Sequence, residues 1–461
     1  MVRGLSGWHM PATVRTHGYW TGLDTGATGN TDSWVIAASA HFPKHFLRAM
    51  HPRDLAIADF TYTLPPERIA QHPLADRDAS RLLVYRDGSI EDRRFGDLPD
   101  VLPPGALLVM NDTRVVNARL LFQRSTGARI EVLCLEPADG GTLEQAMARP
   151  SEALWRCMIG NANRWEPSEV LTLGTPDGHQ LRAERSGSDI VRFTWAPSAC
   201  GFAEMLERFG HVPLPPYMKR PDENADRERY NTVFARHSGS VAAPTASLHF
   251  SPALLDRIGE KGVTSATLTL HVGAGTFAPV KSARMEGHHM HSEQVRVPAA
   301  ALASIGSALE EQRPIVAVGT TALRSLESLY WHGVMILQGR AGEEMDIGQW
   351  EPYGHDPAGL PAPREALAAV VGSLGGHDRD ETRGALTGQT RSLIAPGYKV
   401  RFADALITNF HQPDSTLLLL VAAFIGPAWR QVYDHALAGE YRFLSYGDGS
   451  LLWRDRRRAM Q

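Results

Sequence analysis

The sequence has few cysteines, no long apolar run and no large excess of either charge. Its 461 residues include three cysteines, Cys134, Cys157 and Cys200, an odd number without any C-x-x-C spacing. That usage excludes a disulfide framework and a zinc ribbon, and it favours a reducing cytoplasm. The longest apolar stretch, LLLLVAAFIG after Thr416, is about half the length that a membrane span requires. We therefore expect a cytoplasmic protein with no membrane partner.

The formal net charge of -4 excludes a basic field over the whole surface. A nucleic-acid partner would have to meet a local patch of positive charge. A hydrophobic content of 43% in a chain of this length is ample for a large core and favours two or three domains.

Three segments differ in character from the rest. Residues 1–49 lack both sustained periodicity and the features of a signal peptide, so we expect a poorly ordered extension. Residues 118–198 contain short alternating runs such as ARIEVLCLE and IVRFTW, which predict a small β-barrel inserted into a main domain formed by 50–117 and 199–461. Gly-, Pro- and Asp-rich pieces around one short helix predict an accessory insertion at about 334–390.

Polar residues follow apolar strands at several points of the main domain. Such groups are costly at the end of a buried strand unless they pair or bind something. The segments ALLVMNDTR, PIVAVGTTALRS and DALITNFH place these side chains there: Asn111, Asp112, Thr113, Arg114, Thr320, Thr321, Arg324, Asn409 and His411. A glycine turn between a strand and a helix N-terminus, as in GTTALRS, is a plausible anion site.

The chain is richest in histidine between Ser240 and Glu293. His249 follows the extended segment that contains Thr245 and precedes a predicted helix beginning at Ser251-Pro252, and His271 ends the predicted strand ATLTLHV. A single histidine beside a strand is more often a hydrogen-bonded structural residue. His288 and His291 could bind a metal, but no HExxH or paired-cysteine pattern supports a metal site.

Between the predicted barrel and this segment lies a basic stretch with an aromatic residue. PLPPYMKR ends in Lys219 and Arg220, and Arg227, Arg229 and Tyr230 follow. This stretch is either a solvated helix or loop, or a surface that faces phosphates.

Ten segments closely resemble, in the same order, the S-adenosylmethionine:tRNA ribosyltransferase-isomerase family of queuosine biosynthesis. The resemblance extends from about residue 55 to 453 and depends on NDTRVVNARL, PLPPYMKR, RYNTVFA, GSVAAPTASLHF, TLHVGAGTFAPV, HHMHSE, VGTTALRSLES, APGYKV, LITNFHQPDSTLLLL and YRFLSYGDGSLL. The fold implied by the resemblance is a large α/β domain on a mixed sheet with an inserted β-barrel.

The resemblance implies transfer and isomerisation of the ribosyl group of S-adenosylmethionine onto 7-aminomethyl-7-deazaguanine at the wobble position of a tRNA with a GUN anticodon. The products would be epoxyqueuosine-tRNA, adenine and methionine. S-Adenosylmethionine would be consumed as a substrate, with no cofactor and no metal. We expect a monomer.

For this chemistry we expect the polar strand ends to converge with the Pro244–His249 loop, because one sheet brings such ends to one edge. His249 and His271 are the candidates for proton abstraction, and Asp112 and His411 complete the catalytic set. The expected substrate-binding residues are Asn111, Thr113, Arg114, Thr245, Thr320, Thr321, Arg324, Asn409, Lys219 and Arg220. Two rival functions stay open: a metal-dependent hydrolase that uses His288 and His291, and a non-catalytic RNA-binding protein.

Overall fold

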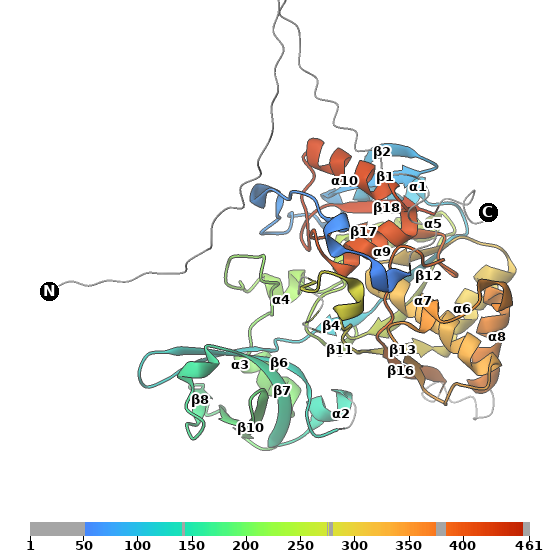
Figure 1. Cartoon of the computed structure of the whole chain (residues 1–461). Coiled ribbons are helices and arrows are strands. Elements are labelled where there is room, and N and C mark those ends of the chain that lie inside the picture. Colours follow the sequence, from blue (N-terminus) through green and yellow to red (C-terminus); the bar gives the residue numbers. More distant parts are fainter. Residues whose placement is uncertain (1–50, 141–142, 274, 276–279, 375–383, 455–461) are drawn as a thin grey trace, which may run out of the picture. The chain divides into compact units, whose positions relative to one another are not determined.

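The protein is described from a computed structural model that covers residues 51–140, 143–273, 275, 280–374 and 384–454. The extension expected over residues 1–49 lies outside these described residues. Two sheets organise the rest of the chain (Figure 1).

The larger sheet is mixed and has ten strands. In spatial order they are β15 (Met345–Ile347), β16 (Ala385–Thr390), β13 (Glu293–Pro298), β12 (Thr264–Leu270), β3 (Leu107–Asn111), β14 (Ile315–Val318), β17 (Ala405–Asn409), β18 (Gly449–Trp453), β1 (Arg81–Arg86) and β2 (Ser89–Arg94). The four neighbours β12, β3, β14 and β17 run parallel. Their carboxyl ends therefore lie at one edge of the sheet, which is the arrangement that the polar strand ends predicted.

The central strands are apolar on both faces because helices cover both sides of the sheet. In β3, Leu107 and Val109 belong to one apolar core, and Leu108 and Met110 belong to another on the opposite face. The first core contains residues of α6 (Ala299–Glu310), α7 (Thr320–Leu337), α8 (Pro363–Leu374), α9 (Thr416–Ile425) and α10 (Ala428–Ala438), and the second contains residues of α1 (Leu98–Val101) and α5 (Pro252–Glu260).

Two helix starts follow directly from the sequence. The Ser251 hydroxyl accepts a hydrogen bond from the backbone N–H of Leu254 at 3.1 Å and caps α5, as the Ser-Pro pair predicted. The Ser415 hydroxyl caps the apolar helix α9 in the same way through Leu418 N–H at 3.2 Å. Each cap satisfies a backbone donor that the first turn leaves without an intrahelical partner.

The smaller sheet is antiparallel and has six strands. They are β5 (Arg119–Gln123), β6 (Arg129–Pro137), β7 (Glu152–Gly160), β10 (Ile190–Ala196), β9 (Gln180–Arg185) and β8 (Leu171–Gly174), in spatial order. The two outer strands, β5 and β8, contact each other without pairing, so the sheet is nearly closed. Its core includes Trp155, Phe193 and Phe202, the last from α3 (Phe202–Phe209). The predicted barrel-like sheet and mixed α/β class are confirmed.

Shorter elements lie outside these two sheets. They are β4 (Thr113–Val115), which pairs with β11 (His237–Ser240), and the helices α2 (Leu143–Ala148) and α4 (Asp226–Arg229). The segment 334–390, which we expected to be an accessory insertion, contributes β15 and β16 to the large sheet through pairing of β16 with β13.

Over the described part of the chain, no single helix has both the length and the apolar character needed to cross a membrane. Only α9 and α10 meet that test as a pair, and they are bent by 114° relative to each other.

Candidate active site

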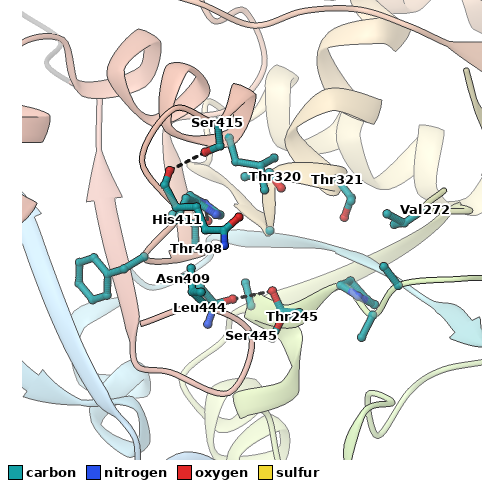
Figure 2. A pocket seen from close by; sticks show the side chains of 18 of the residues that line it. Thr245, Val272, Thr320, Thr321, Thr408, Asn409, His411, Ser415, Leu444 and Ser445 are labelled. Carbon is teal, nitrogen blue, oxygen red and sulfur yellow. Dashed lines mark hydrogen bonds between the residues drawn. The ribbon is translucent and has the colours of Figure 1, made fainter. Parts of the chain in front are cut away.

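A cavity of about 70 Å³ lies at the carboxyl ends of β14 and β17 (Figure 2). We call it the first cavity. Its lining combines the start of α7, the residues that follow β17 and the Ala242–Ala246 segment, and it includes Thr245, Thr320, Thr321, Asn409 and His411. One water needs roughly 10–15 Å³ by the same measure, so this space can admit part of a small molecule.

Asn111 holds the strand ends together beside this cavity. Its Nδ2 donates to the carbonyl of Leu270 at 2.9 Å and to Thr321 Oγ1 at 3.2 Å, and its Oδ1 accepts from the backbone N–H groups of Thr113 and Leu270. The fully buried amide is thereby satisfied within the protein. Asn111 therefore connects the ends of β12 and β3 to the start of α7 through hydrogen bonds.

The next three residues of the same motif lie in different surroundings. Asp112 is buried and accepts a 2.7 Å hydrogen bond from Thr269 Oγ1, and Thr113 Oγ1 lies 2.8 Å from His271 Nδ1. Arg114 is exposed. None of the three lines the first cavity.

A chain of hydrogen bonds joins the first cavity to His249. Thr245 Oγ1 donates to Asn409 Oδ1 at 2.8 Å (Figure 2), and Asn409 Nδ2 lies 3.2 Å from His249 Nε2. Because the amide nitrogen must donate, Nε2 of His249 is the acceptor. The proton of the neutral ring is then on Nδ1, which lies 2.8 Å from Ser80 Oγ.

His249 is therefore held as a neutral ring with both nitrogens engaged. Complete burial lowers its pKa to about 3, and the positive charges of Arg442 and Arg77 act in the same direction. The imidazole fixes the orientation of Asn409, and no ring nitrogen is left for a substrate proton. This geometry favours a positioning role over the predicted role in proton abstraction.

His411 lines the first cavity itself and is fixed by its backbone. Its N–H donates to Tyr433 Oη at 3.0 Å, and its carbonyl accepts a hydrogen bond from Tyr62 Oη. In the ring, Nε2 lies 2.8 Å from Thr408 Oγ1. When Thr408 accepts the Nε2 proton, Nδ1 presents a lone pair. Burial lowers the pKa of His411 to about 3, so the ring is neutral at physiological pH.

His271, the other predicted base, does not line the first cavity. Burial and the nearby His237 lower its pKa to about 4. Its Nδ1 contacts Thr113, which ties the end of β12 to β4.

The N-terminus of α7 borders the first cavity. Gly319 precedes the helix with a φ of 91°, a conformation that side chains other than glycine disfavour. Thr320 and Thr321 form the first turn and are both more than nine-tenths buried. Free N–H groups and the helix dipole make this end favourable for an anionic group.

The predicted cationic residues are largely engaged elsewhere. Arg324 Nη1 forms a 2.5 Å ion pair with Glu293, and both side chains are buried outside the lining of the first cavity. Arg220 donates to both oxygens of Asp226 at 2.7 and 2.8 Å. Lys219 is exposed.

The sequence interpretation missed one wall of the first cavity. Tyr217 and Ser445 line it, with 2.5 Å between their hydroxyl oxygens, and Leu444 lies beside them with a φ of 71°. A positive φ is uncommon for leucine and occurs most often where the surroundings impose it. Tyr217 lies in the segment PLPPYMKR, for which we predicted a function only for the charged residues Lys219 and Arg220.

Histidine, cysteine, aspartate and glutamate side chains form no group of three or more that could hold a metal ion in the ranges that the structure covers. His288 and His291 lie near each other, and burial is the main cause of the lowered pKa of His288.

A cavity at the carboxyl ends of parallel strands, bordered by a helix N-terminus and a histidine, is typical of α/β proteins that bind small ligands. A family model described as "Queuosine biosynthesis protein" matches residues 57–452. The chain therefore belongs to this family of queuosine biosynthesis enzymes, the S-adenosylmethionine:tRNA ribosyltransferase-isomerases, and the predicted resemblance is confirmed.

Individual relatives agree with the family model. The chain is 41% identical over 404 residues to an S-adenosylmethionine:tRNA ribosyltransferase-isomerase of Azoarcus sp. (strain BH72), covering 87% of this chain and 98% of the relative. A relative of the same description from Anaeromyxobacter sp. (strain Fw109-5) is 40% identical, with 87% and 99% covered. The crystal structure of an S-adenosylmethionine tRNA ribosyltransferase from Thermotoga maritima is 27% identical, with 86% and 99% covered and a TM-score of 0.41. The two rival functions are not supported.

Proposed function

We propose that this protein transfers and isomerises the ribosyl group of S-adenosylmethionine onto 7-aminomethyl-7-deazaguanine at the wobble position of a GUN-anticodon tRNA. The products are epoxyqueuosine-tRNA, adenine and methionine. The observation that carries this proposal is the family match over residues 57–452, which includes every residue that lines the first cavity.

The reaction requires a base that removes a proton beside the sulfonium, and His411 fits that requirement best. It lines the first cavity, its ring is neutral, and its backbone is held at both N–H and carbonyl. A neutral imidazole can accept a proton, and a rigidly placed base costs little reorganisation during the step. His271 is the alternative candidate, because its ring is also neutral and only its Nδ1 contacts Thr113.

The remaining polar groups of the first cavity orient the substrates. The N-terminus of α7 with Thr320 suits the methionine carboxylate, since an anion is favoured there. Asn409 and Thr245 form a fixed amide and hydroxyl pair on the opposite side of the cavity lining (Figure 2). Holding an amine nucleophile and a sulfonium substrate in line can contribute about 7–11 kcal/mol to lowering the barrier.

The proposal assigns no metal and no cofactor, because S-adenosylmethionine itself supplies the ribosyl group and is consumed. It also places the enzyme in the cytoplasm as a monomer. The odd number of cysteines, without any C-x-x-C spacing, supports the reducing compartment.

Incubation of the purified protein with S-adenosylmethionine and tRNA that carries the deazaguanine precursor tests the proposal. We expect free adenine and methionine in equal amounts, measured by chromatography. The matched control is the same tRNA with guanine at the wobble position. Adenine release at an equal rate from both tRNAs, or none from either, would contradict the proposed function.

A further inference from the structure

A second, smaller cavity lies on the other side of His249 and is rich in arginine. Arg77, Arg229 and Arg442 line it, together with His249 and the hydroxyl residues Ser80, Ser445 and Tyr446. We call it the arginine cavity. The three arginines come from distant parts of the chain: the short 3-10 helix Arg77–Ala79, the end of α4 and the loop before β18.

Two of these guanidinium groups are half-buried and donate to backbone carbonyls, and neither forms an ion pair with a carboxylate among the described residues. Arg77 donates to the carbonyls of Leu248 at 3.0 Å and Glu228 at 3.2 Å. Arg229 donates to the carbonyls of Ala75 and Leu74, and its buried Nε has no partner among the described residues. Carbonyl oxygens satisfy individual donors but do not neutralise the positive charge.

The third arginine has only a long contact to a carboxylate. Arg442 Nη2 lies 3.5 Å from Asp448 Oδ1, and that carboxylate already accepts the backbone N–H groups of Arg81 and Arg442. Asp448 is not part of the lining, and Asp76, the acidic residue that is, is exposed. The cavity therefore presents more positive than negative charge.

The neighbouring groups respond to this excess of charge. Burial is the main cause of the lowered pKa of Arg77, repulsion from Arg229 adds to it, and the weaker effect of the Glu228 charge opposes it. The charge of Arg442 contributes to the lowered pKa of His249 in the same way. An anion bound among the three guanidinium groups would relieve this repulsion, and phosphate oxygens match their fork geometry.

The arginine cavity is linked to the first cavity. Ser445 lines both, and His249 in the arginine cavity lies 3.2 Å from the amide nitrogen of Asn409 in the first. A nucleotide whose base enters the first cavity would place its own backbone phosphates nearby. Within the first cavity, the N-terminus of α7 favours an anion and suits the methionine carboxylate, so the arginine cavity is left for a different anion.

We propose that the arginine cavity binds a backbone phosphate of the RNA substrate beside the reacting nucleotide. This inference depends on the proposed function. It moves the main phosphate contact from the predicted Lys219 and Arg220 stretch to Arg77, Arg229 and Arg442, which line a cavity that shares Ser445 with the first cavity.

The test compares Arg442→Gln with Arg86→Gln, an exposed arginine at the far end of β1. Fluorescence anisotropy gives the Kd of an anticodon stem-loop RNA carrying the precursor base at several salt concentrations, and calorimetry gives the Kd of S-adenosylmethionine. We expect Arg442→Gln to weaken RNA binding about tenfold and to reduce the salt slope by about 0.7, the value for one phosphate contact on a single strand. Arg86→Gln should match the wild type.

The other outcomes distinguish a phosphate site from a site for the methionine carboxylate and from a folding defect. Unchanged RNA affinity and salt slope in Arg442→Gln would overturn the inference, and so would a loss confined to S-adenosylmethionine binding, which would assign the cavity to the methionine carboxylate. If Arg442→Gln lowers the melting temperature, Arg442→Lys and Arg77→Gln replace it, and both should weaken RNA binding. A wild-type protein that binds the RNA but releases no adenine would contradict the proposed function, and the phosphate site would then be supported only if Arg442→Gln weakens that binding as expected.

Discussion

Two buried histidines, His411 and His249, lie near Asn409 and differ in how many of their ring nitrogens have a hydrogen-bond partner. His411, on the side of the first cavity, has one ring nitrogen next to Thr408, whereas His249, on the side of the arginine cavity, has both ring nitrogens engaged. Burial lowers the pKa of both to about 3. A lowered pKa therefore does not separate a reacting histidine from a positioning one, and the hydrogen-bond partners of each ring do.

The largest effect should come from His411. We expect His411→Gln to lose on the order of 10²-fold or more in the rate of adenine release at saturating substrates, because the amide can still contact Thr408 but cannot act as a base. The melting temperature should change little. Single-turnover adenine release measures the rate.

His271→Gln is the matched comparison for that experiment, because His271 also contacts a threonine through one ring nitrogen. We expect less than a fivefold loss there. A larger loss in His271→Gln than in His411→Gln would transfer proton abstraction to His271.

A smaller effect is expected at His249. His249→Ala leaves Asn409 Nδ2 with only its 3.5 Å contact to the carbonyl of Asp448, so it should lower the rate about tenfold and destabilise the protein by about 1–3 kcal/mol. His249→Gln, whose amide oxygen can accept the same hydrogen bond, should recover most of the rate. A purely structural histidine would give equal rates for folded Ala and Gln variants, and that result would exclude the positioning role.

The pH dependence of stability should sharpen the comparison further. The unfolded chain protonates these histidines near pH 6.5, whereas the folded protein keeps His249 and His411 neutral to about pH 3. Their contribution is fully present above pH 6.5 and is lost as pH falls toward 3, since the unfolded state then binds more protons. Each adds a slope of up to about 1.4 kcal/mol per pH unit.

Urea unfolding between pH 6.5 and 5 measures this slope before most carboxylates titrate. We expect the free energy of unfolding of His249→Gln to change less steeply with pH than that of the wild type, by up to about 1.4 kcal/mol per pH unit. Parallel slopes for the two proteins would show that His249 is not held neutral in the folded state.

The smallest effect should come from Lys219. Because Arg220 is committed to Asp226 and Lys219 is exposed, Lys219→Glu should weaken RNA binding only about twofold at physiological salt. Filter binding with the stem-loop RNA measures it. A loss equal to that of Arg442→Gln would restore the predicted Lys219 stretch as the main phosphate surface.

The sequence predicted that polar strand ends meet at one edge of the sheet, where the first cavity lies, because strand periodicity and polar strand ends are local features. Asn111, Thr321 and Asn409 do come together around the ends of β3, β14 and β17. Local patterns could not show which ring nitrogens have partners. Ser80 and His249 are 169 residues apart, and their 2.8 Å contact depends on the tertiary fold.

The arginines illustrate the same limit. Arg77 and Arg442 lie in polar, turn-rich segments that are typical of solvated loops, and nothing in their spacing indicates that they line one cavity. Arg220, by contrast, stands in a conspicuous basic stretch and is neutralised by a carboxylate six residues away. Charge density along the chain therefore does not indicate which arginines line a cavity and which pair with a carboxylate.

The order of strands in the large sheet has a consequence for how the molecule is made. The last strand, β18, lies between β17 and β1, and within the described residues the β1–β2 hairpin joins the sheet only through β18. A ribosome must therefore synthesise the chain as far as β18 before β1 and β2 can dock on the sheet. The six-stranded sheet, built from one continuous segment, can be complete long before that. The edge of β1 that pairs with β18 stays unpaired until β18 has been synthesised. We therefore expect the nascent main sheet to be the part that depends on chaperones.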